Sequence, residues 1–332
     1  MRLWGRPLSA AGVLGINERN ADFIMPLNPR RLYPRVDDKV RTKRLASDAG
    51  MAVPELYFVA RSQADALLLP KKLEERSSFV VKPANGSGGD GIIVVDGRYG
   101  DHYRLISGEL MSESALLFHV SNIVSGQFSL TGGADSALVE YRVRFDSVFD
   151  AISYQGVPDI RIIVYKGYPA MAMVRLPTRR SGGKANLHQG AVGAGVDIAN
   201  GRTSGAVSGN ERVGDHPDTL SPIADNVVPH WDQILEIAAL GFEVSGLGYL
   251  GVDLVIDRDL GPLMLEMNAR PGLNIQIANG AGLKPRFRAI DQHLSKSPAA
   301  ASPAERAAIS RQLMLGLGET APDGGTTVPT TA

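Results

Sequence analysis

The 332-residue chain contains no cysteine and has no net charge, with 35 basic and 35 acidic side chains. Without cysteine it can form neither a disulfide framework nor a thiolate metal site, which fits a reducing compartment. The balanced charge argues against nucleic acid as the main partner, because binding a phosphate backbone needs a basic excess. No run is long and apolar enough to span a bilayer, and the mild stretch 10–16 lacks the body and cleavage site of a signal peptide. We therefore expect a cytoplasmic protein without a membrane span.

The length and the 44% hydrophobic content allow a large core, divided into about two or three subdomains. Residues 1–36 combine polar residues with prolines, which predicts an extended arm or a short helix plus loop. This arm is locally basic, so it is either a solvated surface segment or a segment that binds phosphate or substrate. Residues 298–332 are rich in Ala, Pro, Thr and Gly, which predicts a flexible tail with one short helix at 303–317.

Near the end of the chain, alternating residues predict two strands, 252–257 and 262–268, joined by a four-residue turn. If the last residue of the first strand pairs with the first residue of the second, Asp253 lies opposite Glu266. Asn268 then lies two residues along on the same face. The hairpin therefore gathers two carboxylates and one amide oxygen.

Facing residues on paired strands lie about 5 Å apart, and like charges there repel each other. A cation between Asp253, Glu266 and Asn268 would relieve that repulsion, and these hard oxygen donors suit magnesium. Two other interpretations stay open at this point. The strands could face solvent, or a nearby Arg or Lys could neutralise the carboxylates.

A second informative segment is a glycine-rich loop, Asn85–Gly91, between predicted strands Phe79–Pro83 and Ile92–Val95. Its glycines formally match the dinucleotide fingerprint G-x-G-x-x-G, but that motif needs a helix after the loop, and β-forming residues follow here. Between two strands, such a loop is typical of a flap whose backbone N–H groups close over phosphates. Lys82, at the end of the entering strand, would reach the nucleotide. The alternative is an ordinary hairpin loop.

The remaining pattern alternates helices with hairpins. We expect a helix from an N-cap at Asp37 or Asp38 to Gly50. The other expected elements are a strand at 57–60, a helix at 62–76 interrupted by Pro70, a helix at 101–125, a strand at 137–143, a hairpin of strands 158–165 and 168–176, and a helix at 229–245.

Taken in order, several motifs resemble the ATP-grasp superfamily. They are Lys39 at a helix start, VVKP with the flap, VEY, DIR, KANLHQG and GVDL…LEMNARPG. More closely, they are similar to RimK-type glutamate ligases and the group called α-L-glutamate ligase-like proteins. The resemblance implies an α+β ATP-grasp fold over residues 37–297, in which two α/β subdomains grip ATP between antiparallel sheets. The flap-bearing subdomain would span about 79–140 and the metal-binding subdomain 141–297, with the usual N-terminal domain absent or reduced to the arm.

The resemblance also implies roles for individual residues. Magnesium, or manganese in its place, would be held by Asp253, Glu266 and Asn268, and Arg175 would stabilise the transferring phosphoryl group. Phosphoryl transfer also needs cationic side chains, and Arg161 is a second candidate for that role. The residues implied to bind ATP are Lys39, Lys82, Gly86, Ser87, Gly88, Gly89, Glu140, Tyr141, Asp159, Lys184 and Asn186. One departure is Arg270, which stands where the RimK type has Ser, and it raises the prospect of a more anionic substrate.

The implied function is an ATP- and magnesium-dependent carboxylate–amine ligase that forms an amide through an acyl phosphate. It would add glutamate or a similar amino acid to a peptide or small-molecule acceptor, in a protein that could be a homo-oligomer. Two alternatives stay open. One is an ATP-grasp phosphotransferase that acts on a small hydroxylated acceptor. The other is a non-catalytic nucleotide-binding module, against which the intact Asp253, Glu266 and Asn268 argue.

Overall fold

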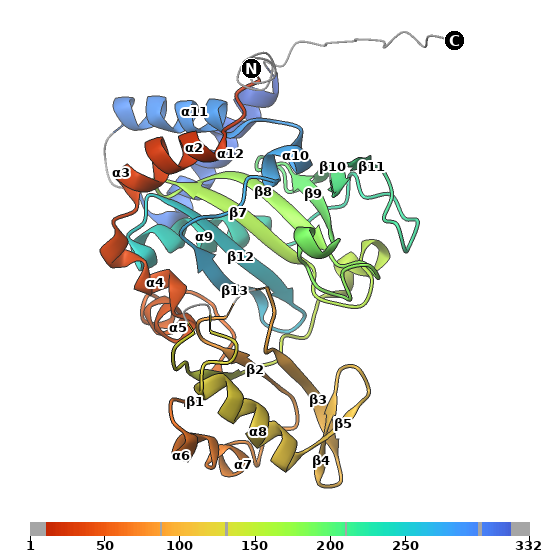
Figure 1. Cartoon of the computed structure of the whole chain (residues 1–332). Helices are drawn as coiled ribbons and strands as arrows, with labels where there is room; N and C mark the ends of the chain where they lie inside the picture. The colour runs from red at the N-terminus through yellow and green to blue at the C-terminus, as the bar shows by residue number, and fades with distance from the viewer. Residues whose placement is uncertain (1–10, 87, 130–131, 210, 298–300, 320–332) are drawn as a thin grey trace, which may run out of the picture.

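Two antiparallel sheets organise the chain in a computed structural model that describes residues 11–86, 88–129, 132–209, 211–297 and 301–319. One sheet has six strands in the order β1-β6-β2-β3-β4-β5, and the other has seven in the order β11-β10-β9-β8-β7-β12-β13. We call the six-stranded sheet with its helices the small lobe and the seven-stranded sheet with its helices the large lobe (Figure 1). This mixed architecture confirms the expected α+β class.

The small lobe is built around residues 56–140. Its strands are β1 (Leu56–Ala60), β2 (Phe79–Pro83), β3 (Ile93–Tyr99), β4 (His102–Leu105), β5 (Leu110–Ser112) and β6 (Ala137–Glu140). Its helices are α6 (Gln63–Ala66), α7 (Leu69–Lys72) and α8 (Glu113–Val124). Because β1 pairs with β6, this lobe begins earlier in the chain than the expected start at residue 79.

The predicted helix at 101–125 is wrong in its first half. Residues 102–112 form the strands β4 and β5, because Gly100 and Gly108, both at positive φ, turn the chain at each end of β4. Tyr103 on β4 then packs edge-on against Phe79 at 5.5 Å. Helix α8 starts only after Ser112, whose hydroxyl accepts a hydrogen bond from the Ala115 N–H as an N-cap.

The large lobe carries the longest strands. They are β7 (Asp159–Tyr165), β8 (Tyr168–Leu176), β9 (Val192–Val196), β10 (Thr203–Ser208), β11 (Glu211–Val213), β12 (Tyr249–Asp257) and β13 (Gly261–Asn268). Its helices are η3 (Ser147–Ile152), η4 (Leu187–Gln189), α9 (Trp231–Ser245), α10 (Ile275–Asn279), α11 (Leu283–Lys296) and α12 (Pro303–Glu319). The hairpin of β7 and β8 matches the predicted one, with Lys166 and Gly167 at positive φ in its turn.

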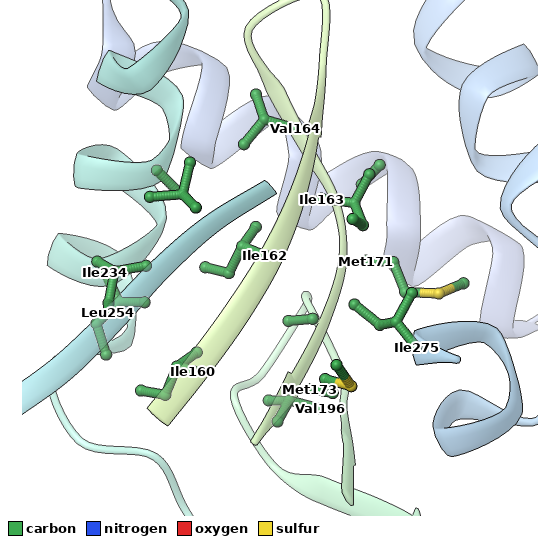
Figure 2. Close-up of a cluster of buried hydrophobic side chains, with 14 of the residues drawn as sticks. Ile160, Ile162, Ile163, Val164, Met171, Met173, Val196, Ile234, Leu254 and Ile275 are labelled. Atoms are coloured by element: carbon green, nitrogen blue, oxygen red, sulfur yellow. The ribbon is translucent and has the colours of Figure 1, made fainter. Parts of the chain in front are cut away.

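Both faces of this sheet are covered, which explains its nearly continuous apolar strands. Figure 2 shows Ile160, Ile162 and Val164 on the side of α9 and its Ile234, while Ile163 lies on the opposite side with Met171. All these side chains are fully buried. Burying each one stabilises the fold by about 1.5–3 kcal/mol. The sheet is therefore a rigid support for the polar side chains that its strands carry.

The N-terminal segment differs from the expected surface arm. It forms α2 (Ile16–Glu18), the π-helical turn η1 (Arg19–Ile24), α3 (Met25–Leu27), η2 (Arg30–Leu32) and α4 (Pro34–Asp37). Phe23 packs against Phe287 at 5.0 Å, and the Asn28 side chain donates to the carbonyls of Tyr249 and Ala269. The segment therefore belongs to the core of the large lobe. Of the two structures left open, the extended arm is wrong and short helices are found, because apolar residues such as Ile24 and Leu27 face that core.

Two further helices, α5 and α12, lie near the start and the end of the described chain. Helix α5 (Lys39–Asp48) follows the segment, and the Asp38 carboxylate caps it by accepting from the N–H groups of Val40 and Arg41, as predicted. Helix α12 contains the short helix predicted within the tail. The expected flexible tail does not hold over 303–319, where α12 packs on α9 and Arg306 is buried and donates to the Gly167 carbonyl. Residues 298–300 and 320–332 lie outside the described residues. Within the described ranges, no helix is both long and apolar enough to cross a membrane.

Candidate functional site

A cleft of about 800 Å³ lies between the two lobes. The small lobe contributes the end of β2 and the glycine-rich loop that follows it, and the large lobe contributes β7, β8, β12 and β13 with the loop at 183–188. The glycine loop and the carboxylate hairpin therefore line one cavity. This common cavity is the arrangement on which the sequence-based hypothesis depends.

Strand pairing places charged side chains in a row along the large-lobe wall. Arg175 on β8 is the partner of Asp159 on β7, Arg161 on β7 is the partner of Asp253 on β12, and Asp253 is in turn the partner of Glu266 on β13. Because partners on paired strands lie on the same face, the register alone brings Arg175 and Arg161 beside Asp159 and Asp253, and it leaves the two carboxylates of Asp253 and Glu266 facing each other at the β12–β13 edge.

These groups are tightly paired. The Arg161 guanidinium donates through Nε to Asp253 Oδ1 at 2.7 Å and through Nη2 to Oδ2 at 2.5 Å. Arg175 forms a two-pronged ion pair with Asp159 and also donates from Nη2 to Asp253 Oδ2 at 3.0 Å. Arginine suits this role because its planar fork matches a carboxylate. The neutralised-carboxylate interpretation left open above thus describes Asp253.

Burial and pairing shift the pKa values of the two aspartates in opposite directions. Asp253 is buried, which opposes its charge, but Arg161 and then Arg175 outweigh burial and hold the pKa of Asp253 well below its usual range. For Asp159, burial raises the pKa to about 6, and the nearby Asp253 charge adds to the rise while Arg175 opposes it. Asp253 therefore stays ionised, whereas the raised pKa of Asp159 favours its neutral form at mildly acidic pH.

The predicted pairing of Asp253 with Glu266 is confirmed, although the predicted pairing at the turn is wrong. The turn pairs Asp257 with Gly261 rather than with Pro262, and a bulge on β13 restores the expected register before Glu266. The extra residue is Leu265, which lies between the paired positions Met264 and Glu266. Met264, which directly precedes the bulge, packs in the main core.

The three predicted metal ligands lie close together, but they differ in how far their oxygens already accept hydrogen bonds from arginine. The Asn268 amide nitrogen lies 3.3 Å from both Asp253 Oδ2 and Glu266 Oε1. Glu266 forms no ion pair among the described residues, whereas both oxygens of Asp253 accept hydrogen bonds from arginine. The described residues hold no cluster of three or more His, Asp or Glu side chains able to bind a metal.

This donor set fits magnesium, which takes one or two protein carboxylates and fills its shell with phosphate and water. Glu266 and the oxygen of the Asn268 amide are the residues that would hold the ion. Asp253 would join them only if Arg161 and Arg175 turned toward another anion.

A buried charge triad closes the small-lobe side. Glu140 accepts from Lys82 at 2.6 Å and from Lys43 at 2.7 Å. Burial lowers the pKa of Lys43 to about 8, with Glu140 acting against that fall. Lys43 was not among the predicted site residues, although its spacing of four residues from Lys39 puts both lysines on one face of the helix.

The flap is fixed at both of its roots. Lys39 Nζ donates to the Gly86 carbonyl at 2.7 Å, and the Asn85 side chain donates to Asp135 at 2.7 Å. At the other root, His119 Nε2 lies 2.9 Å from the Gly91 carbonyl oxygen. Lys39 therefore contacts the flap backbone, a contact that the sequence did not predict.

The lining of the cleft includes most of the predicted site residues. They are Lys39, Lys82, Gly86, Gly88, Gly89, Asp159, Arg161, Arg175, Lys184, Asn186, Asp253, Glu266 and Asn268. Ser87 lies outside the described residues. Glu140 and Tyr141 do not belong to the described lining; Glu140 binds the two lysines, and the Tyr141 hydroxyl donates to Asp257 at 3.0 Å. The lining also contains Asp37, which sequence reasoning did not single out as a site residue.

Two antiparallel sheets with a common cleft, a glycine-rich flap and a carboxylate hairpin define the chain as a protein with the ATP-grasp fold. More specifically, residues 18–292 match the model of the sugar-transfer associated ATP-grasp family, and the chain belongs to that family. The expected superfamily is therefore confirmed. No curated protein matches the chain.

Several solved structures are similar to the chain at low sequence identity. Biotin carboxylase from Campylobacter jejuni is 14% identical with a TM-score of 0.47, and the match covers 90% of this chain and 48% of that one. D-alanyl-alanine synthetase A from Vibrio cholerae is 12% identical, with a TM-score of 0.45 and coverage of 86% and 67%. The ATP-grasp ligase PsnB bound to a minimal precursor is 11% identical, with a TM-score of 0.43 and 86% of this chain covered. The match spans 63% of the PsnB chain.

Proposed function

We propose that the protein is an ATP- and magnesium-dependent ligase that joins a carboxylate to an amine. The observation that carries this proposal is the single cleft of about 800 Å³ that the flap, the lysines, the arginine pairs and the Glu266–Asn268 edge all line. These are the groups needed to hold a triphosphate and to neutralise charge as its γ-phosphoryl group is transferred.

The proposed chemistry has two steps. First, a carboxylate oxygen of the acceptor attacks the γ-phosphorus of ATP, so that an O–P bond forms and the bond to ADP breaks. The product is an acyl phosphate, which makes the carbonyl carbon electrophilic. An amine nitrogen then attacks that carbon, the C–N bond forms, and inorganic phosphate leaves with the bonding electrons while the amine loses a proton.

Residues of this chain have distinct parts in these steps. Lys82, Lys39 and the flap amides after Asn85 are placed to hold the phosphates, and Arg161 and Arg175 are placed to stabilise the phosphoryl group. Glu266 and Asn268 would hold magnesium, which supplies charge neutralisation and orientation of the β- and γ-phosphates. Closing the flap would exclude water, which would otherwise hydrolyse the acyl phosphate.

The substrates complete the proposal. We propose an amino acid such as glutamate as one substrate and a peptide or small molecule as the other, in a cytoplasmic enzyme that could work as an oligomer. The test is ADP release by the full chain with ATP and magnesium, across paired panels of carboxylates and amines, with mass spectrometry of the products.

The expected result is an amide whose formation requires both substrates. An oxygen-18 label on the carboxylate should appear in the released phosphate. ADP formation that no carboxylate–amine pair stimulates would contradict the ligase.

A phosphotransferase that acts on a hydroxyl group is the second candidate. The description of the family as sugar-transfer associated favours it, since sugars present hydroxyl acceptors. The same assay separates the two candidates. A stable phosphorylated alcohol that forms without any amine supports the phosphotransferase. Transfer of oxygen-18 from a carboxylate to phosphate excludes it.

A further inference from the structure

A second cavity of about 540 Å³ opens beside the main cleft, and we call it the arm pocket. Its lining consists of Arg30, Tyr33, Pro34, Asp37, Asp38, Asn85 and Arg270. Three of these residues, Asp37, Asn85 and Arg270, also line the main cleft. A molecule in the arm pocket would therefore reach the proposed reaction centre through this shared edge.

Two arginines make the arm pocket attractive to an anion. Arg30 comes from the N-terminal segment and Arg270 from the loop after β13, and both are exposed. Within the described part of the chain, neither guanidinium forms an ion pair with a carboxylate, in contrast to Arg161 and Arg175. Arg270 lies over the Tyr33 ring at 5.1 Å, which fixes its position by a cation–π contact and leaves its N–H groups available.

The two aspartates of the pocket differ in availability. Asp38 is occupied as the N-cap of α5, where its Oδ1 accepts hydrogen bonds from the backbone. Among the residues that the structure describes, the Asp37 carboxylate accepts no such bond, and Asp37 lines both cavities. Burial raises the pKa of Asp37, and the nearby Arg270 and Lys39 charges oppose the rise. The raised pKa works against the ionised form, but the position of Asp37 at the shared edge of the two cavities lets its carboxylate accept hydrogen bonds from an ammonium group there.

We propose that the arm pocket binds the amine substrate and that this substrate is an α-amino carboxylate. Its carboxylate lies on Arg30 and Arg270, and its amino group lies at Asp37, facing the main cleft. This inference rests on the proposed ligase function, which it deepens by assigning the class of the amine and the residues that recognise it. It also gives the N-terminal segment a role in substrate recognition.

The positions of the charges support this assignment. The anion-binding arginines and the shared edge with the cleft orient the molecule with its nitrogen toward the reaction centre. A simple amine would make no use of the two arginines, and a simple carboxylate would leave Asp37 without the ammonium partner that an amino acid supplies. A guanidinium pair recognises a carboxylate well, because each fork can donate two parallel hydrogen bonds.

The test measures binding to the full chain in the presence of magnesium and the ATP analogue AMPPNP, by calorimetry. The probes are the standard L-amino acids and, for each one that binds, its decarboxylated amine and its des-amino acid. We expect at least one amino acid to bind and both of its truncated forms to bind at least about tenfold more weakly.

Variants localise the site. Arg30→Gln and Arg270→Gln should each weaken amino-acid binding at least about tenfold. Arg31→Gln is the matched control, because Arg31 is exposed on the same turn but absent from the described pocket lining. It should bind like the wild type. Asp37→Asn should reduce the discrimination against the des-amino acid. The affinity for AMPPNP is measured for each variant, so that loss of folding is recognised.

The outcomes separate this inference from the ligase proposal. If amides form but Arg30→Gln and Arg270→Gln bind the amino acid like the wild type, the arm pocket is not its site and the ligase stands. If glucuronate or glucose 1-phosphate binds there and no amino acid does, the substrate class is wrong. Equal binding of the des-amino acid would reduce the pocket to an anion site and overturn the role of Asp37.

Discussion

The two walls of the cleft are built on opposite principles. The small-lobe wall is largely backbone, with Gly88, Gly89 and Gly91 at positive φ in a loop between two strands. The large-lobe wall consists of charged side chains, and pairs such as Arg161 with Asp253 are locked across strands that are buried on both faces. One wall can adapt its shape to phosphates, while the other presents a charge pattern that is fixed before any ligand arrives.

The contrast extends to how each wall is held. The flap is held at its roots by Lys39, Asp135 and His119, and the described residues between those roots, with Ser87 left aside, form no strand. We call the side chains of Asp159, Arg161, Arg175, Asp253 and Glu266 on the large lobe the charged wall. The strands that carry them pair with one another along the whole row. We therefore expect changes to the charged wall to lower turnover and changes to the flap to weaken nucleotide binding.

The largest expected loss of turnover comes from changing Glu266, the proposed magnesium ligand at the β13 end of the charged wall. Glu266→Gln should lower turnover by about a thousandfold, roughly 4 kcal/mol of lost stabilisation of the transferring phosphoryl group. The fold should survive, because Glu266 is only half-buried and forms no ion pair in the described chain. Steady-state ADP release measures the loss, and circular dichroism checks the fold. Glu236→Gln, on the exposed face of α9, is the matched control. Near-normal turnover in Glu266→Gln would argue against a metal at this edge.

The buried lysine of the small lobe should combine two effects. Lys82→Met leaves Glu140 with Lys43 as its one remaining partner, which should lower the free energy of unfolding by about 3 kcal/mol and raise the KM for ATP. Urea unfolding and initial rates measure the two effects. Adding Glu140→Gln should recover part of the stability but not the KM. Lys72→Met, at an exposed position of α7, serves as the control. An unchanged KM would remove Lys82 from the nucleotide site.

The raised pKa of Asp159 makes stability depend on pH. A carboxyl group whose folded-state pKa exceeds its unfolded value stabilises the fold when protonated, and this contribution is lost as pH rises. For Asp159 the window runs from the ordinary 3.8 to about 6 and corresponds to about 2–3 kcal/mol.

Between pH 7 and pH 4, the wild type should therefore gain stability relative to Asp159→Asn. Urea unfolding of both proteins at several pH values tests this expectation. Parallel curves across that window would show that Asp159 is not shifted.

The smallest effect should come from the flap. A Cβ at Gly91 would lie 2.7 Å from the Phe128 ring, and its φ of +74° disfavours any side chain. Gly91→Ala should therefore displace the flap root and raise the KM for ATP about tenfold, or about 1.4 kcal/mol, with less effect on kcat. Gly88→Ala has a similar φ but open space around it, and should do less.

The control for these flap variants is Gly100→Ala. Gly100 has positive φ and open surroundings in the turn between β3 and β4, away from the cleft. Its KM should match the wild type. An equal rise in all three variants would mean that general backbone strain, and not the flap, controls nucleotide binding.

The sequence predicted those features that depend on neighbouring residues. Hairpin alternation placed Asp253 opposite Glu266, and the pattern of glycines placed the flap between strands. It could not predict that β12 also pairs with β7, because that contact joins residues far apart in the chain. As a result, neutralisation of the carboxylates by a nearby Arg or Lys was left as one of several alternatives, and Arg161 was not named as the partner of Asp253.

Other misses have the same physical origin. Lys43 becomes important only because β6 brings Glu140 to it, and Asn28 because it bonds to the backbone of Tyr249, over two hundred residues away. The bulge at Leu265 adds one residue to β13, and alternation alone gives no sign of it. Local patterns thus predicted the helices, the strands and most residues of the cleft. Pairing between strands far apart in the sequence decided which of the cleft's charged side chains form ion pairs with one another.

The most direct test of the central claim is a crystal structure of the full chain with AMPPNP and magnesium. The account predicts the triphosphate between the flap and the charged wall, with the metal about 2.1 Å from oxygens of Glu266 and Asn268. A nucleotide bound outside the cleft, or a metal that neither Glu266 nor Asn268 contacts, would contradict it.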